Sequence, residues 1–283
     1  MKNKNKILGV SAVMAALSLS LVLPACARKD YTNYTNGNET SQETEIEENE
    51  VTAVPEEKEE EPVIAIVPEP KIERVSYVMP TASGLNLRAG AGTGYASLGS
   101  AEKNTLYALL GSENGWYKIA FNNGQAYLSS KYCKIVQMEK SSNADIEKII
   151  AEGCKYLGVK YVYGATRYHD GSGKKLSGFS TSAFDCSSLM QYIFKMGAGI
   201  NLQVNTRTQI YQGTTVKKNE IKRGDLLFFT NASRKNNVGV ERVGHVALYL
   251  GDNYILHTAS DYAKIEQISA TRWGYYIQTQ RVL

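Results

Sequence analysis

Cysteine and histidine are scarce in this chain, which has four cysteines and three histidines among 283 residues. So few cysteines, so widely spaced, do not form the framework of a disulfide-rich fold. The chain also has no Cys-x-x-Cys motif and no close pair of histidines, which argues against a zinc site. The residues of interest are therefore single cysteines, namely Cys26, Cys133, Cys154 and Cys186. For Cys133 and Cys154 both a disulfide outside the cell and two buried thiols remain open.

Aromatic residues are absent from positions 35–73, and hydrophobic residues are sparse there. Residues 30–73 hold 14 of the 28 acidic residues with only two lysines, whereas residues 74–283 hold 14 acids against 25 Lys and Arg. Low hydrophobicity with high net charge predicts a disordered acidic linker over residues 28–74. A basic folded part behind it suggests a polyanionic partner, and for an exported protein that means cell-wall polymer or a membrane surface rather than nucleic acid.

The only long apolar run lies at the start, where three lysines precede an uncharged stretch from Ile7 to Ala25. This pattern predicts an export signal over residues 1–27, so the mature protein works outside the cytoplasm. The sequence LPAC at 23–26 resembles a bacterial lipoprotein box, which would make Cys26 a lipidated terminus in the cell envelope. Ordinary cleavage after Ala27 and free secretion is the alternative, since Pro24 is unusual in that box. A lipid anchor would be the only contact with the membrane.

Residues 75–138 lack any helix-period window, and short β-type runs alternate with turns such as Asn114-Gly115 and Asn123-Gly124. Asn-Gly between such runs is a strong hairpin signal, which predicts a small all-β barrel. The segments GLNLRAG at 84–90, NGWYKI at 114–119 and GQAYLSSKY at 124–132 resemble a bacterial SH3-type domain. The resemblance implies binding of cell-wall polymer or packing on a catalytic domain. Trp116 and Tyr117 are candidates for either ligand contact or core.

Residues 141–283 begin with helical patterns and continue with β-type runs. A capping sequence before Asp145 opens an apolar stripe of helical period, and a second helix follows Asp185. The later runs, at 225–229, 246–250, 254–257 and 275–282, predict an antiparallel sheet. Helices followed by such a sheet give an α+β domain.

Cys186 lies at the boundary between a polar loop and an apolar helical stripe. With Asp185 as N-cap, its thiol belongs to the first helical turn, where unpaired N–H groups and the helix dipole favour a thiolate. The sequence therefore predicts that Cys186 is a nucleophile.

Two of the three histidines follow Cys186 in β-type runs. His245 begins one run and His257 ends the next, across a short turn at 251–253, so adjacent antiparallel strands can bring them together. A thiol, an imidazole and a group that orients the imidazole make up a nucleophilic cysteine site. Asp225 is an alternative third member, and a zinc site of the cysteine and the two histidines is the alternative chemistry. The third histidine, His169, is expected to be solvent-exposed in a surface loop.

Four motifs occur in order: YVYG at 161–164, FDCSSL at 184–189, RGDLLFF at 223–229 and GHVALYLGD at 244–252. Together they resemble the NlpC-type family of cell-wall cysteine peptidases, which have a compact papain-like fold. The resemblance implies Cys186 as nucleophile, His245 as general base and acid, and His257 as the orienting residue. It also implies that Asp185 and Ser187 bind a free substrate amino terminus, with Tyr161 near the thiol, and it implies no metal or other cofactor.

The implied activity is a peptidoglycan hydrolase that cleaves stem peptides or muropeptides at the γ-D-glutamyl–diamino acid bond. An amidase or acyltransferase with the same three residues, and a non-catalytic wall-binding lipoprotein, are the alternatives. The family motif usually has glycine where Ser188 and Ala165 stand here, which we expect to leave the chemistry intact. The loops before Phe184 and before His245 are longer than usual, so they could form a lid or rim.

Overall fold

The computed structural model describes residues 72–283. The predicted export signal with Cys26, and all but the last three residues of the predicted acidic linker, lie outside the described residues. Within residues 72–283, no helix has the length and apolar character needed to cross a bilayer.

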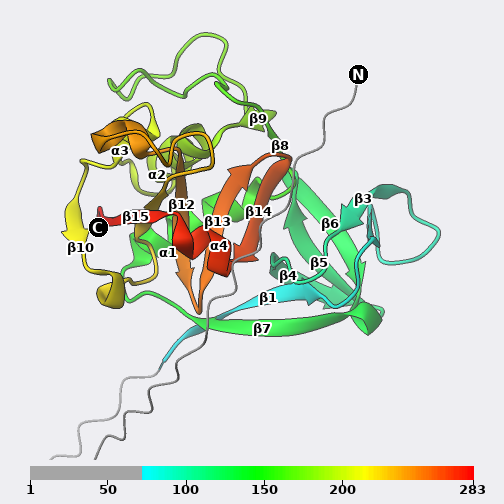
Figure 1. Cartoon of the computed structure of the whole chain (residues 1–283). Coiled ribbons are helices and arrows are strands. Elements are labelled where there is room, and N and C mark those ends of the chain that lie inside the picture. Colours follow the sequence, from blue (N-terminus) through cyan, green and yellow to red (C-terminus); the bar gives the residue numbers. More distant parts are fainter. Residues whose placement is uncertain (1–71) are drawn as a thin grey trace, which may run out of the picture. The chain divides into compact units, whose positions relative to one another are not determined.

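The first part of the described chain is all-β, as predicted (Figure 1). Its seven strands pair in the order β3-β2-β6-β5-β4-β1-β7, and every pairing is antiparallel. The strands are β1 (Arg74–Pro80), β2 (Leu85–Arg88), β3 (Ser97–Ala101), β4 (Tyr107–Glu113), β5 (Trp116–Phe121), β6 (Gly124–Ser129) and β7 (Cys133–Glu139), with a 3₁₀ turn at Ser130–Tyr132.

The two predicted hairpins are present, but the second turn lies one residue earlier than expected. Asn114 and Gly115 have φ of 50° and 78° between β4 and β5, as a tight hairpin turn requires. In the next turn Asn122 and Asn123 take φ of 50° and 57°, so that Gly124 already belongs to β6. Asparagine tolerates this left-handed region better than other residues with a side chain, which explains the shift.

The second part combines helices with an eight-stranded sheet of order β10-β15-β11-β12-β13-β14-β8-β9. All of its pairings are antiparallel except β8 with β9. The helices are α1 (Ala144–Lys155), α2 (Cys186–Ala198), α3 (Thr206–Gln209) and α4 (Ala270–Gly274), with 3₁₀ turns at Lys218–Glu220 and Gly239–Arg242. The strands are β8 (Lys160–Tyr161), β9 (Ala183–Phe184), β10 (Thr214–Val216), β11 (Leu226–Phe229), β12 (His245–Gly251), β13 (Tyr254–Ala259), β14 (Tyr262–Gln267) and β15 (Tyr276–Arg281). The predicted papain-like α+β class is confirmed.

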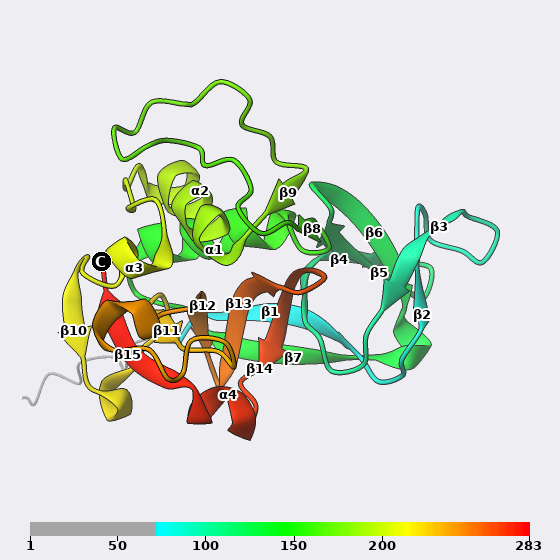
Figure 2. The ribbon, with the colours of Figure 1, turned by 45° about the horizontal axis from the view of Figure 1, so that its top comes forward.

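The central strands are covered on both faces, which explains why β11 and β12 are apolar almost throughout. Helices α1 and α2 lie on one side of the sheet and the short α4 on the other (Figure 2). The helices approach closely at Gly197, where an added Cβ would lie 2.6 Å from the Ile149 backbone. On the other face Ala247 and Ile255 pack with Trp273.

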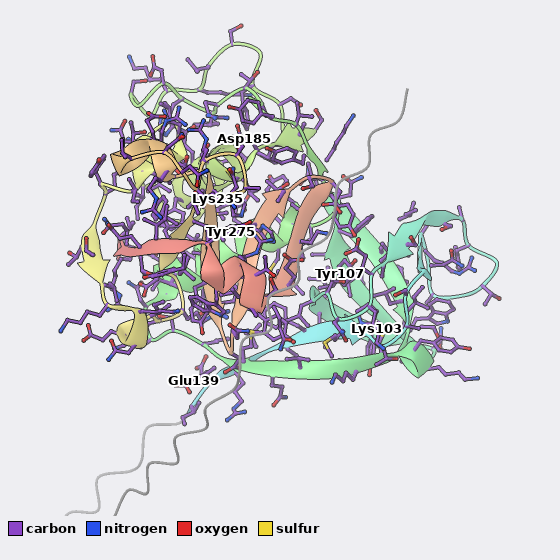
Figure 3. All side chains as sticks on the ribbon, viewed as in Figure 1. Lys103, Tyr107, Glu139, Asp185, Lys235 and Tyr275 are labelled. Atoms are coloured by element: carbon purple, nitrogen blue, oxygen red, sulfur yellow. The ribbon has the colours of Figure 1, made fainter. Side chains whose placement is uncertain are left out.

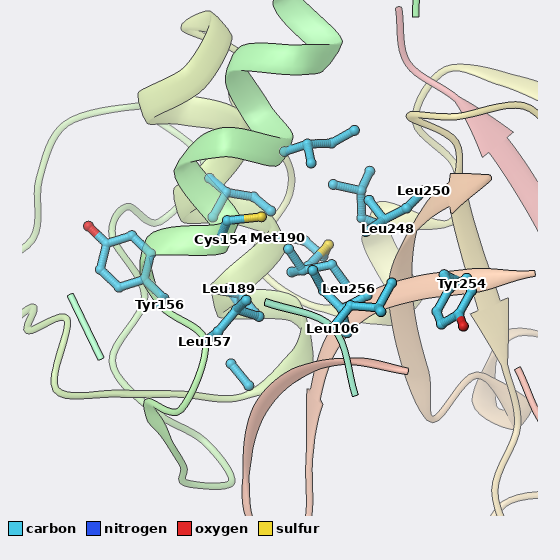
Figure 4. Packing of buried hydrophobic residues seen from close by; sticks show 14 of the residues in the cluster. Leu106, Cys154, Tyr156, Leu157, Leu189, Met190, Leu248, Leu250, Tyr254 and Leu256 are labelled. Carbon is cyan, nitrogen blue, oxygen red and sulfur yellow. The ribbon is translucent and has the colours of Figure 1, made fainter. Parts of the chain in front are cut away.

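The hydrophobic core runs without a break from the all-β part into the helix-and-sheet part. Figure 4 shows Leu106, which precedes β4, packed beside Met190 of α2 and Leu256 of β13. Polar contacts reinforce the junction, since Arg223 bonds both carboxylate oxygens of Glu147 and the hydroxyl of Tyr77. The two parts are therefore packed together, as their short connection predicts.

Candidate active site

Cys186 is the first residue of α2, as the sequence predicts. Asp185, labelled in Figure 3, is the N-cap that lies between β9 and this helix. Its carboxylate accepts from the backbone N–H of Ser188 at 2.8 Å, and the Ser188 hydroxyl accepts from the N–H of Asp185 at 2.9 Å. This reciprocal capping box fixes the residues on both sides of the thiol.

The helix start, which favours a thiolate, is opposed at Cys186 by burial. Cys186 is only 8% exposed, and burial, followed by the charge of Asp185, raises the pKa of its thiol to about 12. The backbone N–H groups of Val246 and Ser187 bond the sulfur and act in the opposite direction, but burial outweighs them. Burial thus favours the thiol over the thiolate in the resting site. Its bond to Val246 places the sulfur beside the strand residue that follows His245.

His245 and His257 form a direct hydrogen bond, with His245 Nε2 3.0 Å from His257 Nδ1. The pairing of Leu248 with Leu256 puts His245 opposite Ala259, so the two histidines are diagonal neighbours on one face of the sheet. The sequence prediction that adjacent strands bring them together is confirmed.

Glu266 continues this line and was missed in the sequence. Its Oε1 lies 3.0 Å from His257 Nε2 and 2.9 Å from a guanidinium nitrogen of Arg272. Because His257 pairs with Lys264, Glu266 is again the diagonal neighbour on the next strand. The signal was present, since Ala263 and Ile265 alternate with polar residues in YAKIEQ at 262–267, as in a half-buried strand, yet no strand was predicted there.

The charges along this line determine which ring nitrogens carry the protons. Burial opposes the ionised form of Glu266, but its hydrogen bond and nearby positive charges prevail and lower its pKa to about 2. Burial lowers the pKa of His257, and burial with the neighbouring His257 and Arg272 lowers that of His245 well below its usual range. Both imidazoles are thus neutral at pH 7. An ionised Glu266 requires His257 to donate from Nε2, so His245 donates from Nε2 and keeps a free lone pair on Nδ1.

Two neighbouring cavities meet at this site. One, of about 450 Å³, is lined by Cys186 together with Asp185 and Ser187. The other, of about 380 Å³, is lined by His245. Tyr161 lines both, and burial followed by the charges of Cys186 and Asp185 raises the pKa of its phenol. Tyr161 thus joins the cavity of Cys186, Asp185 and Ser187 to the cavity of His245, and His257 lies behind His245.

Other candidates lie elsewhere. Asp225 is paired with Arg281 at 2.8 Å and lines neither cavity. Cys133 and Cys154 are free thiols. The expectation for His169 is wrong, because it is fully buried and bonded to Gln191. No group of three or more His, Cys, Asp or Glu residues in the described part of the chain is arranged to hold a metal ion.

Comparison with known proteins agrees with these motifs. Residues 158–282 match the NlpC/P60 family, and residues 83–134 match the bacterial SH3 domain. The chain carries an NlpC/P60 domain behind a bacterial SH3 domain. The resemblance seen in the sequence is confirmed for both domains.

Several proteins similar to this chain are named as peptidases. A γ-D-glutamyl-L-lysine dipeptidyl-peptidase of Bacillus subtilis is 30% identical over 60% of this chain and 50% of the relative. A probable endopeptidase NlpC homolog of Haemophilus influenzae is 32% identical over 40% of this chain and 57% of the relative. A crystal structure of an NlpC/P60 family protein from Bacillus cereus covers 74% of this chain and 64% of its own, at 24% identity and a TM-score of 0.40. The chain thus spans less than two thirds of the length of each of these proteins.

Proposed function

We propose that this protein is an exported peptidoglycan hydrolase that cleaves an amide bond in stem peptides with Cys186 as nucleophile. The observation that carries the proposal is the hydrogen-bonded line from Glu266 through His257 to His245, the residue before Val246, whose backbone N–H bonds the thiol. The names of the Bacillus subtilis and Haemophilus influenzae relatives support an endopeptidase. The former favours the bond between γ-D-glutamate and the diamino acid.

The resting site holds a neutral thiol and a neutral imidazole. When substrate binds, the Cys186 proton moves to His245 Nδ1 and the thiolate attacks the peptide carbonyl. The backbone N–H of Cys186 itself, at the first turn of α2, stabilises the oxyanion, since the next N–H groups of that turn bond the sulfur and the Asp185 carboxylate. The imidazolium of His245 then protonates the leaving amine, and the regenerated base activates water to hydrolyse the acyl-enzyme. No cofactor enters these steps.

The line behind His245 stabilises the imidazolium that forms during this reaction. His257 holds His245 in the tautomer with a free Nδ1, and the negative charge of Glu266 lies on the far side of His257. An orienting group of this kind keeps the base in its productive tautomer and orientation. His257 thus serves as the third catalytic residue.

The remaining parts deliver this chemistry to the cell wall. Residues 1–27 are an export signal with lipidation at Cys26, and residues 28–74 are an acidic tether. Residues 75–138 form the SH3-like domain, which binds wall polymer, and residues 141–283 form the peptidase domain. Trp116 is half-buried and lines a surface hollow of the SH3-like domain, which suits contact with a ligand.

Mass spectrometry of defined muropeptides and stem peptides incubated with the protein tests the proposal, with Cys186→Ala as the control. We expect release of the fragment ending in D-glutamate by the native protein only. Cysteine-dependent cleavage at the glycan–peptide junction would identify an amidase, and transfer to an added amine would identify an acyltransferase. Binding of these peptides without any cleavage would overturn the hydrolase proposal and indicate a non-catalytic wall-binding protein.

A further inference from the structure

The guanidinium of Arg167 fills the space beside Asp185 and Ser187. It lies 2.7 Å from Asp185 Oδ2 and 3.2 Å from the Ser187 hydroxyl. Its other N–H groups bond the backbone carbonyls of Ala165 at 2.7 Å and Val204 at 2.5 Å. A positive group of the chain itself therefore occupies the place where a substrate ammonium would bind this acid and hydroxyl.

The carboxylate of Asp185 has no capacity left for another donor. A carboxylate offers about four lone-pair positions. Asp185 Oδ2 accepts from Arg167 and from the N–H of Gly164, and Oδ1 accepts from the Ser187 hydroxyl and the N–H of Ser188. A substrate amine could bind here only by displacing one of these partners.

The segment that carries Arg167 is anchored on its C-terminal side. The ring of the next residue, Tyr168, packs against Phe179 and Tyr192 at centroid distances of 5.2 and 5.7 Å. His169 is fully buried, and Gln191 of α2 bonds both its N–H and its carbonyl oxygen. Arg167 is thus held in the long β8–β9 loop, residues 162–182, by packing as well as by its own bonds.

The charge of the surrounding cavity also disfavours an ammonium. Its charged lining residues are Arg167, Arg207 and Arg234 against the single acid Asp185. Glu241 pairs with Arg207 at 3.4 Å and with Arg234 at 3.2 Å, but this leaves the group positive by one charge. A carboxylate or an uncharged amide is therefore accepted more readily than a cation.

We propose that Arg167 is a specificity-determining residue that excludes a free substrate amino terminus. The site then takes peptides whose amino end is acylated and uncharged and which carry free carboxylates. In the wall this class consists of stems still joined to glycan through an amide. The inference rests on the proposed function, and it reverses the expectation that Asp185 and Ser187 receive a free amine.

The test compares one stem peptide with a free amino terminus and the same peptide N-acetylated. For the native protein we expect kcat/KM to favour the acetylated peptide by roughly tenfold or more, and Arg167→Ala to lose or invert that ratio. Arg167→Lys, which keeps a positive charge beside Asp185, should keep the preference. Arg207→Ala is the comparison variant, because it removes one positive charge of the cavity that does not bond Asp185, so it should weaken the preference less than Arg167→Ala does.

Binding of both peptides to Cys186→Ala, with and without Arg167→Ala, separates this inference from the proposed function. Loss of all cleavage with a retained binding preference would overturn the hydrolase and leave the role of Arg167 standing. Native preference for the free amine, or an unchanged ratio in Arg167→Ala, would overturn the inference. If Arg167→Ala fails to fold, Arg167→Gln gives the same comparison, because its neutral amide can still donate to the Asp185 carboxylate while the positive charge is lost.

Discussion

The imidazole side and the thiol side of the candidate active site each contain an arginine–carboxylate pair, but the two carboxylates have different partners. On the imidazole side, Glu266 lies 2.9 Å from Arg272 and bonds His257, the imidazole for which we propose a catalytic role. On the thiol side, Asp185 lies 2.7 Å from Arg167 and caps the helix of the nucleophile. The first pair is carried by the sheet and α4, and the second by a long loop and a helix start. In our proposals, strands and a helix hold the residues of the reaction, and the loop that carries Arg167 determines which peptides bind.

The largest effect is expected on the imidazole side. His257→Ala should lower kcat/KM by about 10²–10⁴-fold, because His245 loses the group that fixes its tautomer and stabilises its imidazolium. Steady-state kinetics on the cleaved stem peptide measures this, with circular dichroism to confirm the fold. His257→Gln is the control, since its amide can still accept from His245. Unchanged turnover in the alanine variant would remove His257 from the mechanism.

The same contrast explains what the sequence could and could not predict. His245 and His257 lie on strands whose period-two pattern fixes which side chains share a face, so their meeting was predictable. Glu266 was equally accessible by that logic, and it was missed because residues 262–267 were not assigned to a strand. The thiol was placed correctly by its capping sequence and apolar stripe.

The contacts made by the β8–β9 loop could not be predicted from the sequence. The sequence does not predict that Arg167 bonds Asp185, because the residues between them show no helical or strand periodicity. His169 illustrates the same gap, since a polar stretch reads as exposed until aromatic packing around Tyr168 and Phe179 buries it. The raised pKa of the Cys186 thiol was not predicted either. The helix start favours a thiolate, whereas burial, which is visible only in the fold, favours the thiol.

A smaller effect is expected when the charge behind His257 is removed. Glu266→Gln keeps an acceptor for His257 but loses the negative charge, so kcat should fall by about tenfold. His257→Ala provides the comparison, because it interrupts the same line one residue nearer the thiol. If Glu266→Gln turned over substrate as fast as the native protein, the charge of Glu266 would have no role in the reaction.

Glu266 also gives the imidazole side an acid-sensitive contribution to stability. Its pKa is about 2 in the folded chain against 4.5 ordinarily, so the folded state binds this proton less readily than the unfolded state. The stabilisation is therefore complete above pH 4.5 and is lost as the pH falls towards 2. Urea unfolding at several pH values should show a smaller loss over this window for Glu266→Gln. Parallel curves for the two proteins would contradict this assignment.

The smallest effect is expected on the thiol side, at the capping box. Ser188→Ala removes the hydroxyl that accepts from the N–H of Asp185, while the Asp185 carboxylate still accepts from the N–H of residue 188. The free energy of unfolding should fall by about 1 kcal/mol, the usual value of a cap, with kcat nearly unchanged. Thermal unfolding and kinetics on the same preparation measure both. A large loss of kcat would mean that the cap positions Cys186 for attack, and the thiol side would then share the catalytic role now assigned to the strands.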